Sequence, residues 1–200
     1  MASCDVPLLG RISAGDGPTM GRRRQEGPSA SMSPAFSLKE SDDEFLAGAR
    51  NRHVHVVDVP APLSEVWAWL SADDALVSWS PLISGHRWTS PRPFGVGATR
   101  VVTLGHAVAL TERFYRWDEQ QRMSFSVESA SIPGLRRFAE DLQLAATDSG
   151  TQLTWTFAVE GGRMLQPLLR AMDSVTKRIT ASIANGIVHR AGAPVGAGNE

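Results

Sequence analysis

The stretch LQPLLRAMDSVTKRITASIANGI, residues 165–187, gives the clearest secondary-structure signal in the chain. Its apolar side chains recur mostly at steps of three and four residues, at Leu165, Leu168, Leu169, Met172, Val175, Ile179, Ile183 and Ile187. This spacing places them on one face of a helix, and Pro167 falls in the first turn, where a missing N–H costs little. The stretch therefore predicts one long amphipathic helix whose apolar face must be covered.

The residues before this helix read as strands separated by turns. Runs rich in β-branched and aromatic residues predict strands at 53–59, 83–89, 99–104, 107–117, 122–127, 135–146 and 151–159. After the first strand, Ser64 is the expected N-cap of a helix at 65–70, and a second short helix is expected at 73–78. The predicted order is one strand, two short helices, about six antiparallel strands and the long helix.

Four stretches in this order carry a resemblance to a known superfamily. They are VDVPAPLSEVWAWLSADDALVSWSP (57–81), FGVGATRVV (94–102), RWDEQQRMSFSV (116–127) and DSGTQLTWTF (148–157). Together they resemble the START-like (SRPBCC) polyketide cyclase/dehydrase superfamily over about residues 53–190. The resemblance implies an α+β helix-grip fold, in which a curved antiparallel sheet of about seven strands wraps around the C-terminal helix.

The chain is expected to divide into one domain and two tails. Residues 1–50 are rich in Gly, Pro, Ser and charged residues, and such a segment buries too little apolar surface to offset its ordering entropy. We therefore expect a mostly disordered tail at 1–50, in which 37–46 is able to form a short helix. The START-like domain is expected at 51–190, followed by a flexible tail at 191–200.

Charge and hydropathy exclude several classes of partner. The 20 basic and 21 acidic residues nearly cancel, so nothing in the charge attracts nucleic acid or an anionic membrane surface. No apolar run approaches the roughly 18 residues of a membrane span, and the first residues do not resemble a secretory signal. With Cys4 as the single cysteine, no internal disulfide is possible. We expect a cytoplasmic protein, with no nucleic acid or integral membrane association.

Neither a nucleotide cofactor nor a metal is expected. The loop at 94–100, FGVGATR, resembles a phosphate-binding glycine loop, but Arg100 stands where a third glycine is needed. A strand rather than a helix follows it, so no helix dipole meets a pyrophosphate. His53 and His55 lie two residues apart on the first strand, without the further ligands that zinc requires.

The resemblance implies a cavity between the sheet and the long helix, occupied by an apolar or aromatic small molecule that is lipid-like or polyketide-like. It implies no catalytic signature that can be placed on this chain. Two alternatives stay open: a cofactor-free cyclase/dehydratase acting in the same cavity, and a protein-interaction module resembling chaperone co-activators. Members of this kind are frequent in bacteria, and a protein partner cannot be named from the residues.

Strand alternation indicates which side chains face the cavity. Phe138 and Leu142 share a face with Glu140, and Leu110 shares a face with Glu112 and His106. Alternatively, a β-bulge reverses the register and puts both glutamates outside, with Arg113, Arg116, Arg136 or Arg137 as surface partners. The candidate ligand-binding residues are Trp79, Trp88, His106, Glu112, Phe114, Glu140, Trp155, Leu168 and Met172.

Overall fold

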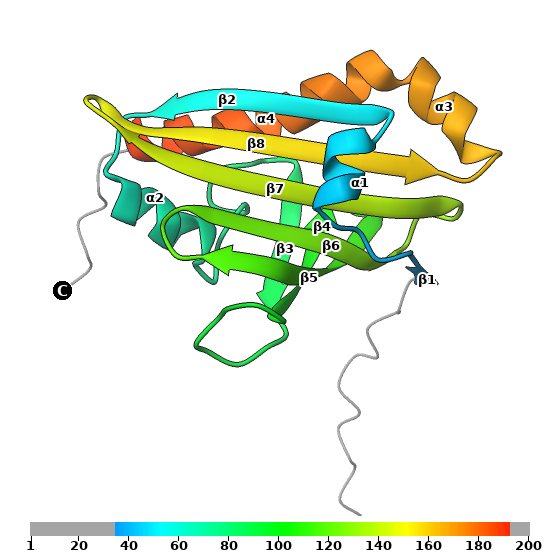
Figure 1. The fold of residues 1–200 in the computed structure, drawn as a ribbon, viewed down its shortest axis with the longest axis horizontal. Coiled ribbons are helices and arrows are strands. Elements are labelled where there is room, and N and C mark those ends of the chain that lie inside the picture. The colour runs from blue at the N-terminus through cyan, green and yellow to red at the C-terminus, as the bar shows by residue number, and fades with distance from the viewer. Residues whose placement is uncertain (1–34, 193–200) are drawn as a thin grey trace, which may run out of the picture. The chain divides into compact units, whose positions relative to one another are not determined.

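The computed structural model describes residues 35–192. The elements are β1 (Phe36–Ser37), α1 (Asp43–Gly48), β2 (Asn51–Val59), α2 (Leu63–Leu70), β3 (Ile83–Trp88), β4 (Thr99–Leu104), β5 (Val108–Asp118), β6 (Arg122–Ala130), β7 (Leu135–Thr147), β8 (Gly150–Gly161), α3 (Leu165–Ala171) and α4 (Asp173–Gly192). The α+β helix-grip class is confirmed: a curled antiparallel sheet accompanies a long C-terminal helix (Figure 1).

The sheet has the strand order β2-β8-β7-β6-β5-β4-β3, and the short β1 adds to β6. All neighbouring strands are antiparallel, and most are joined by short turns, as the turn residues of the sequence predict. The first long strand pairs with the last, so β2 and β8 run side by side from Asn51↔Val159 to Val59↔Thr151. This pairing brings β2 next to β8, the strand that leads into the C-terminal helices.

The region after β2 differs from expectation in two details. The helix α2 begins two residues early, and Pro62 rather than Ser64 occupies its N-cap position. Residues 73–79 form consecutive turns instead of the expected second short helix. Leu76 has φ 67, a left-handed conformation that an α-helix cannot continue through. Leu76 is nonetheless buried, so packing against the core maintains this turn.

The expected single helix at 165–187 is two helices. It breaks at Met172, where φ −95 and ψ 10 end α3, and α4 starts at Asp173. The two parts pack differently: none of the residues of α3 is buried, whereas Ile183 and Ile187 of α4 lie in the main core. The helical segment is therefore anchored at its C-terminal half, and its N-terminal half covers the sheet loosely.

Gly186 lets α4 approach the core closely. A Cβ atom at this position would lie 2.7 Å from the backbone oxygen of Trp79, far inside normal contact distance. Trp79 belongs to the main core cluster together with Ile183 and Ile187. The contact between Gly186 and Trp79 thus fixes the anchored half of α4.

Part of the expected N-terminal tail lies on the outer face of the sheet. Asp42 caps α1 by accepting a hydrogen bond from the Phe45 N–H at 2.8 Å, and Phe45 and Leu46 pack against Ala139 and Ala158. Figure 1 shows α1 in front of β7 and β8, whereas α4 passes behind β2 and β8. The folded part thus starts before residue 51, because these side chains are buried. The remaining parts of the two expected tails, 1–34 and 193–200, lie outside the described residues.

Candidate functional site

A cavity of about 310 Å³ lies between the inner face of the sheet and the loosely packed helical segment. Its walls are mainly apolar side chains from β3, β4, β5, β7 and β8 and from α3 and α4. Those supplied by the helices are Leu165, Leu168, Leu169, Met172, Ile179 and Ile183. Four polar residues share the lining, namely Glu112, Glu140, Thr176 and Thr180. This combination of apolar walls and a few polar groups is typical of small-molecule sites.

A buried ion pair supports one of the two carboxylates. Arg100 and Glu112 are cross-strand partners on β4 and β5, and Arg100 Nε lies 2.5 Å from Glu112 Oε2. Aromatic rings enclose the guanidinium, with Phe114 and Phe125 at 5.0 and 4.8 Å from its carbon. Burial raises the pKa of Glu112, and the Arg100 charge and hydrogen bond oppose this rise. Such a pair tolerates burial because each charge has its partner and the rings attract the cation.

The second carboxyl group has a neutral partner. The indole Nε1 of Trp155 donates a hydrogen bond of 2.8 Å to Glu140 Oε2, and both side chains are buried. Burial raises the pKa of Glu140 well above its usual value, and the nearby negative charge of Glu112 raises it further. Since the single cation of this cluster already pairs with Glu112, burial favours the neutral, protonated form of the Glu140 carboxyl group.

The two threonines of the lining are hydrogen-bonded to their own helix. Thr176 donates to the carbonyl oxygen of Met172 at 3.1 Å, and Thr180 donates to that of Thr176 at 3.0 Å. The Thr180 hydroxyl also lies 2.8 Å from Nε2 of His55 on β2. The contact between Thr180 and His55 attaches α4 to β2.

Five of the nine candidate ligand-binding residues line this cavity: Glu112, Glu140, Trp155, Leu168 and Met172. Both glutamates are buried on the inner face, so the surface alternative is wrong for them. Register shifts do occur in β5, between Thr111 and Glu112 and after Phe114, yet Glu112 is buried and lines the cavity. Their role in ligand binding stays a prediction.

The other four candidates lie elsewhere. Phe114 is fully buried below Arg100, and Trp88 stacks on Phe94 with ring centroids 3.9 Å apart. Trp79 packs against α4 at Gly186. His106 is exposed in the turn between β4 and β5, next to Gly105 with φ 54, so strand alternation does not extend to it. These residues are not among those that line the cavity.

The sequence reasoning missed the role of Arg100. In the sequence, Arg100 stands out only as the residue that replaces a glycine of a nucleotide-binding loop, but the strand pattern contains a second signal. Arg100 alternates with Val102 on one face of β4, and the hairpin register pairs Arg100 with Glu112 and Val102 with Leu110. A hairpin turning at 105–107 therefore brings the basic and the acidic side chain to the same face.

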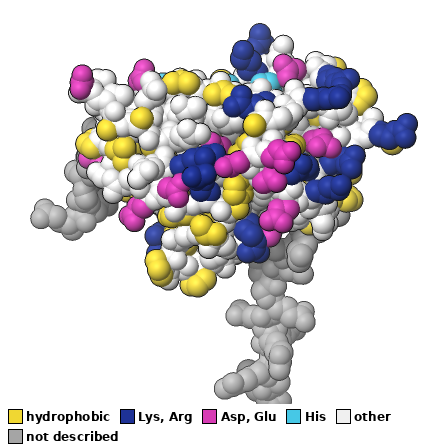
Figure 2. All heavy atoms as spheres, in the orientation of Figure 1, with side chains coloured by type: hydrophobic (Ala, Val, Ile, Leu, Met, Phe, Trp, Pro, Cys, Tyr) yellow, Lys and Arg dark blue, Asp and Glu magenta, His cyan; other side chains and the backbone are white. Residues whose placement is uncertain are grey.

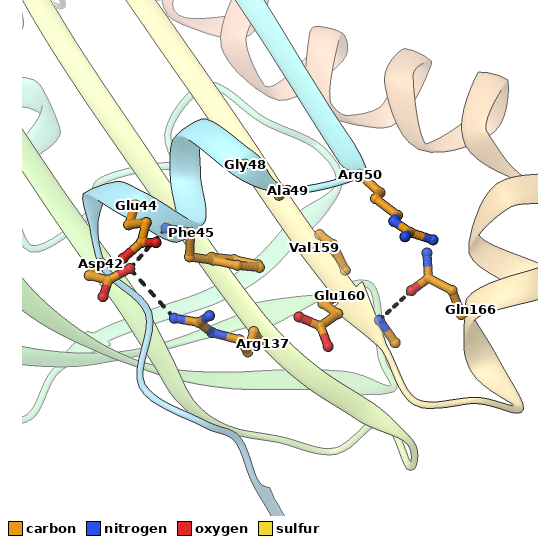
Figure 3. Close-up of a pocket in the computed structure, with 11 residues that line it drawn as sticks. Asp42, Glu44, Phe45, Gly48, Ala49, Arg50, Arg137, Val159, Glu160 and Gln166 are labelled. Carbon is orange, nitrogen blue, oxygen red and sulfur yellow. Dashed lines mark hydrogen bonds and ion pairs between the residues drawn. The ribbon is translucent and has the colours of Figure 1, made fainter.

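A second hollow, of about 580 Å³, lies on the outer side of the sheet beside α1. Figure 3 shows Asp42 directed at Arg137, at an N–O distance of 3.5 Å, and Arg137 also lies 4.3 Å from the Phe45 ring. On the other side, Gln166 accepts a hydrogen bond from the Gly161 N–H at 2.9 Å. These polar groups serve mainly to hold α1 and α3 on the sheet.

Charges are mixed on the outer face that carries α1. Figure 2 shows acidic and basic side chains interspersed there, without a large area of one sign. Several form pairs, such as Arg122 with Asp141 at 2.6 Å and Arg116 with Asp118 at 2.7 Å. Between residues 35 and 192 there is no group of three or more metal-ligating side chains. In the same range, no helix has the length and apolar character needed to cross a membrane.

Comparison with known proteins agrees with this architecture. A family model described as polyketide cyclase / dehydrase and lipid transport matches residues 52–188. An uncharacterized protein of Mycobacterium tuberculosis is 32% identical over 115 residues, which cover 58% of this chain and 69% of that protein.

Solved structures show the same fold at low sequence identity. The Zhui aromatase/cyclase from Streptomyces sp. R1128 has a TM-score of 0.58 and 17% identity, and the match covers 70% of this chain and 93% of that one. A START superfamily protein from Mycobacterium smegmatis has a TM-score of 0.56 and 15% identity, covering 70% of this chain and 97% of that one.

Proposed function

The chain belongs to the polyketide cyclase / dehydrase and lipid transport family, and from its cavity we propose that it binds an apolar small molecule beneath α3 and α4. The observation that carries this proposal is the 310 Å³ space with apolar walls and two buried carboxyl groups. Its volume is at the lower end of the usual range of ligand sites, about 300–1,000 Å³, which favours a compact ligand.

The exposed side chains around the cavity support the same conclusion. Leu168 and Met172 line the cavity and are still 51% and 43% exposed, which is unusual for large apolar residues. A bound apolar molecule would remove this surface from water, at about 25 cal/mol for each Å². The break at Met172 and the unburied α3 provide the element that would adjust to a ligand.

Binding can be tested by titrating the protein with Nile red, a neutral apolar dye. We expect Leu168→Trp to fill the cavity entrance and weaken binding at least tenfold. Met164→Trp is the matched control, because Met164 is 96% exposed just before α3 and does not line the cavity. Equal affinity of both variants, with unchanged unfolding midpoints, would contradict the proposal. Native mass spectrometry of protein from its own host would identify the natural ligand.

An enzymatic role in the same cavity is the second candidate. Glu140, whose neutral form burial favours, would act as the acid and the neighbouring Glu112 would act as the base that a dehydration or cyclisation needs. Glu140→Gln should then retain ligand binding and abolish turnover. The third alternative, a chaperone co-activator-like module, would be favoured by a small or filled cavity and has less support from an open cavity of about 310 Å³. The cytoplasmic location and the absence of nucleic-acid partners stay predictions from composition.

A further inference from the structure

The polar groups of the cavity cannot neutralise a ligand anion. Among the residues that line it there is no Lys, Arg or His. The nearest buried cation, Arg100, pairs with Glu112 at 2.5 Å and is covered by the rings of Phe114, Phe125 and Trp88. A ligand carboxylate or phosphate would therefore lose its hydration without gaining a cation, and it would also face the charge of Glu112.

Most hydrogen-bond donors of the lining are already used within the protein. The hydroxyl groups of Thr176 and Thr180 donate to helix carbonyl oxygens, and the Trp155 N–H donates to Glu140. The carboxyl group of Glu140 differs from them. Its Oε2 accepts the Trp155 hydrogen bond, whereas Oε1 has no hydrogen-bond partner among residues 35–192.

The balance of buried charges indicates that the Glu140 carboxyl group keeps its proton and can donate a hydrogen bond. Two acids and one guanidinium are buried together, and the guanidinium neutralises one acid. An ionised Glu140 would be an unpaired buried charge, and keeping the proton avoids this unfavourable state. The proton of Glu140 is then the one donor of the lining without a fixed protein acceptor in the described residues.

We propose that the cavity selects uncharged ligands with a hydrogen-bond acceptor, such as a ketone or ester carbonyl, and that Glu140 positions this acceptor by donating to it. This inference rests on the proposed ligand-binding function and adds the ligand class. It excludes fatty-acid anions and other carboxylates as preferred ligands. An amine is also disfavoured, because it would require burying a ligand cation together with an ionised Glu140.

A matched set of two-ring ligands tests the selection on the unmodified protein. The set is 2-acetylnaphthalene, 2-ethylnaphthalene, 2-naphthoate and 2-(aminomethyl)naphthalene, with affinities measured by isothermal titration calorimetry at neutral pH. We expect the ketone to bind about fivefold to tenfold more tightly than the hydrocarbon, as one hydrogen bond allows. The naphthoate should bind at least a hundredfold more weakly than the ketone, and the amine more weakly than the ketone.

Variants of Glu140 then show whether this residue recognises the ligand acceptor or only supports the fold. Glu140→Gln retains a neutral donor and an acceptor for Trp155, so the preference for the ketone should persist. Glu140→Met removes the donor at similar volume, and the ratio of ketone to hydrocarbon affinity should fall to about one. If Glu140→Met does not fold, the relative affinities of the four ligands for the unmodified protein still test the proposed selection.

The outcomes distinguish this inference from the function on which it rests. Failure of all four compounds to bind, the hydrocarbon included, would overturn the binding function and the inference with it. Equal binding of ketone and hydrocarbon, or preference for the naphthoate or the amine, would overturn the selection alone and leave apolar binding intact. The expected ranking, with the preference lost in Glu140→Met, would support both.

Discussion

Arg100 and Glu112 form a 2.5 Å ion pair between neighbouring strands, and both side chains are only 3% exposed. The pair lies directly beneath the cavity, where Glu112 contributes to the lining and Arg100 is covered by aromatic rings. It therefore links the stability of the sheet to the electrostatics of the candidate site. Removing either partner leaves the other charge buried without compensation.

Arg100→Met should destabilise the fold by about 3–5 kcal/mol, because it leaves the Glu112 carboxylate unpaired in the core. The double variant Arg100→Met/Glu112→Gln should be more stable than Arg100→Met, since it removes the uncompensated charge as well. Urea unfolding of the wild type, Arg100→Met, Glu112→Gln and the double variant gives the interaction energy between the two side chains. Strictly additive losses would show that the two side chains do not depend on each other.

Glu140 should make the protein less stable as the pH rises. Burial and the charge of Glu112 raise the pKa of Glu140 well above the value of 4.5 expected in the unfolded chain. Above pH 4.5 the unfolded chain loses this proton while the folded protein retains it, so stability falls until the pH passes the folded-state pKa. Within that pH range, each rise of one pH unit lowers the free energy of unfolding by up to about 1.4 kcal/mol.

Glu140→Gln cannot titrate and should remove this part of the pH dependence. The free energy of unfolding of the variant, relative to the wild type, should therefore increase as the pH rises above 4.5, until the folded-state pKa of Glu140 is passed. Chemical unfolding at several pH values measures this difference. A difference that does not change with pH would mean that Glu140 is ionised in the folded protein.

His86 should weaken the fold under acidic conditions. Burial, together with the charge of Arg100, lowers the pKa of His86 from 6.5 to about 4. The unfolded chain binds a proton as the pH falls below 6.5, whereas the folded protein resists it until about pH 4, so stability falls over this range.

His86→Gln should flatten the fall of the unfolding midpoint between pH 6.5 and pH 4. His106→Gln is the matched control, because His106 is exposed in the turn between β4 and β5. Thermal unfolding monitored by circular dichroism across this range is sufficient. The same acid profile for both variants would exclude His86 as the source.

Gly186→Ala should disturb the anchored half of α4. The added methyl group would lie 2.7 Å from the Trp79 carbonyl oxygen and 2.8 Å from its ring, and overpacking of this kind costs about 1–3 kcal/mol. Gly192→Ala in the same helix meets nothing within 4 Å and serves as the control. Denaturant midpoints of the two variants measure the difference, and a Gly186→Ala variant as stable as the control would contradict the close contact.

Alternation along the strands was sufficient to suggest inward carboxyl groups, but it did not exclude a β-bulge that would turn both outward. Glu112 and Glu140 share faces with Leu110 and Leu142, and a period of two residues carries this information without any knowledge of the sheet. The same alternation on β4, combined with the hairpin register, contains the position of Arg100. It failed for His106 because a turn does not follow strand alternation.

The sequence by itself determined the succession of strands and helices along the chain, because this follows from local periodicity and turn residues. The helix-grip class was implied by the resemblance to a known superfamily, and the face of the two acids was left open between two alternatives. Only the tertiary structure decided where the C-terminal helical segment breaks and which half of it packs. Leu168 and Ile187 continue one apolar stripe, yet one borders a cavity and the other is fully buried. Periodicity indicates which side chains are apolar and share a face. Whether such a side chain packs against protein atoms or borders a cavity depends on how closely segments distant in the chain approach it.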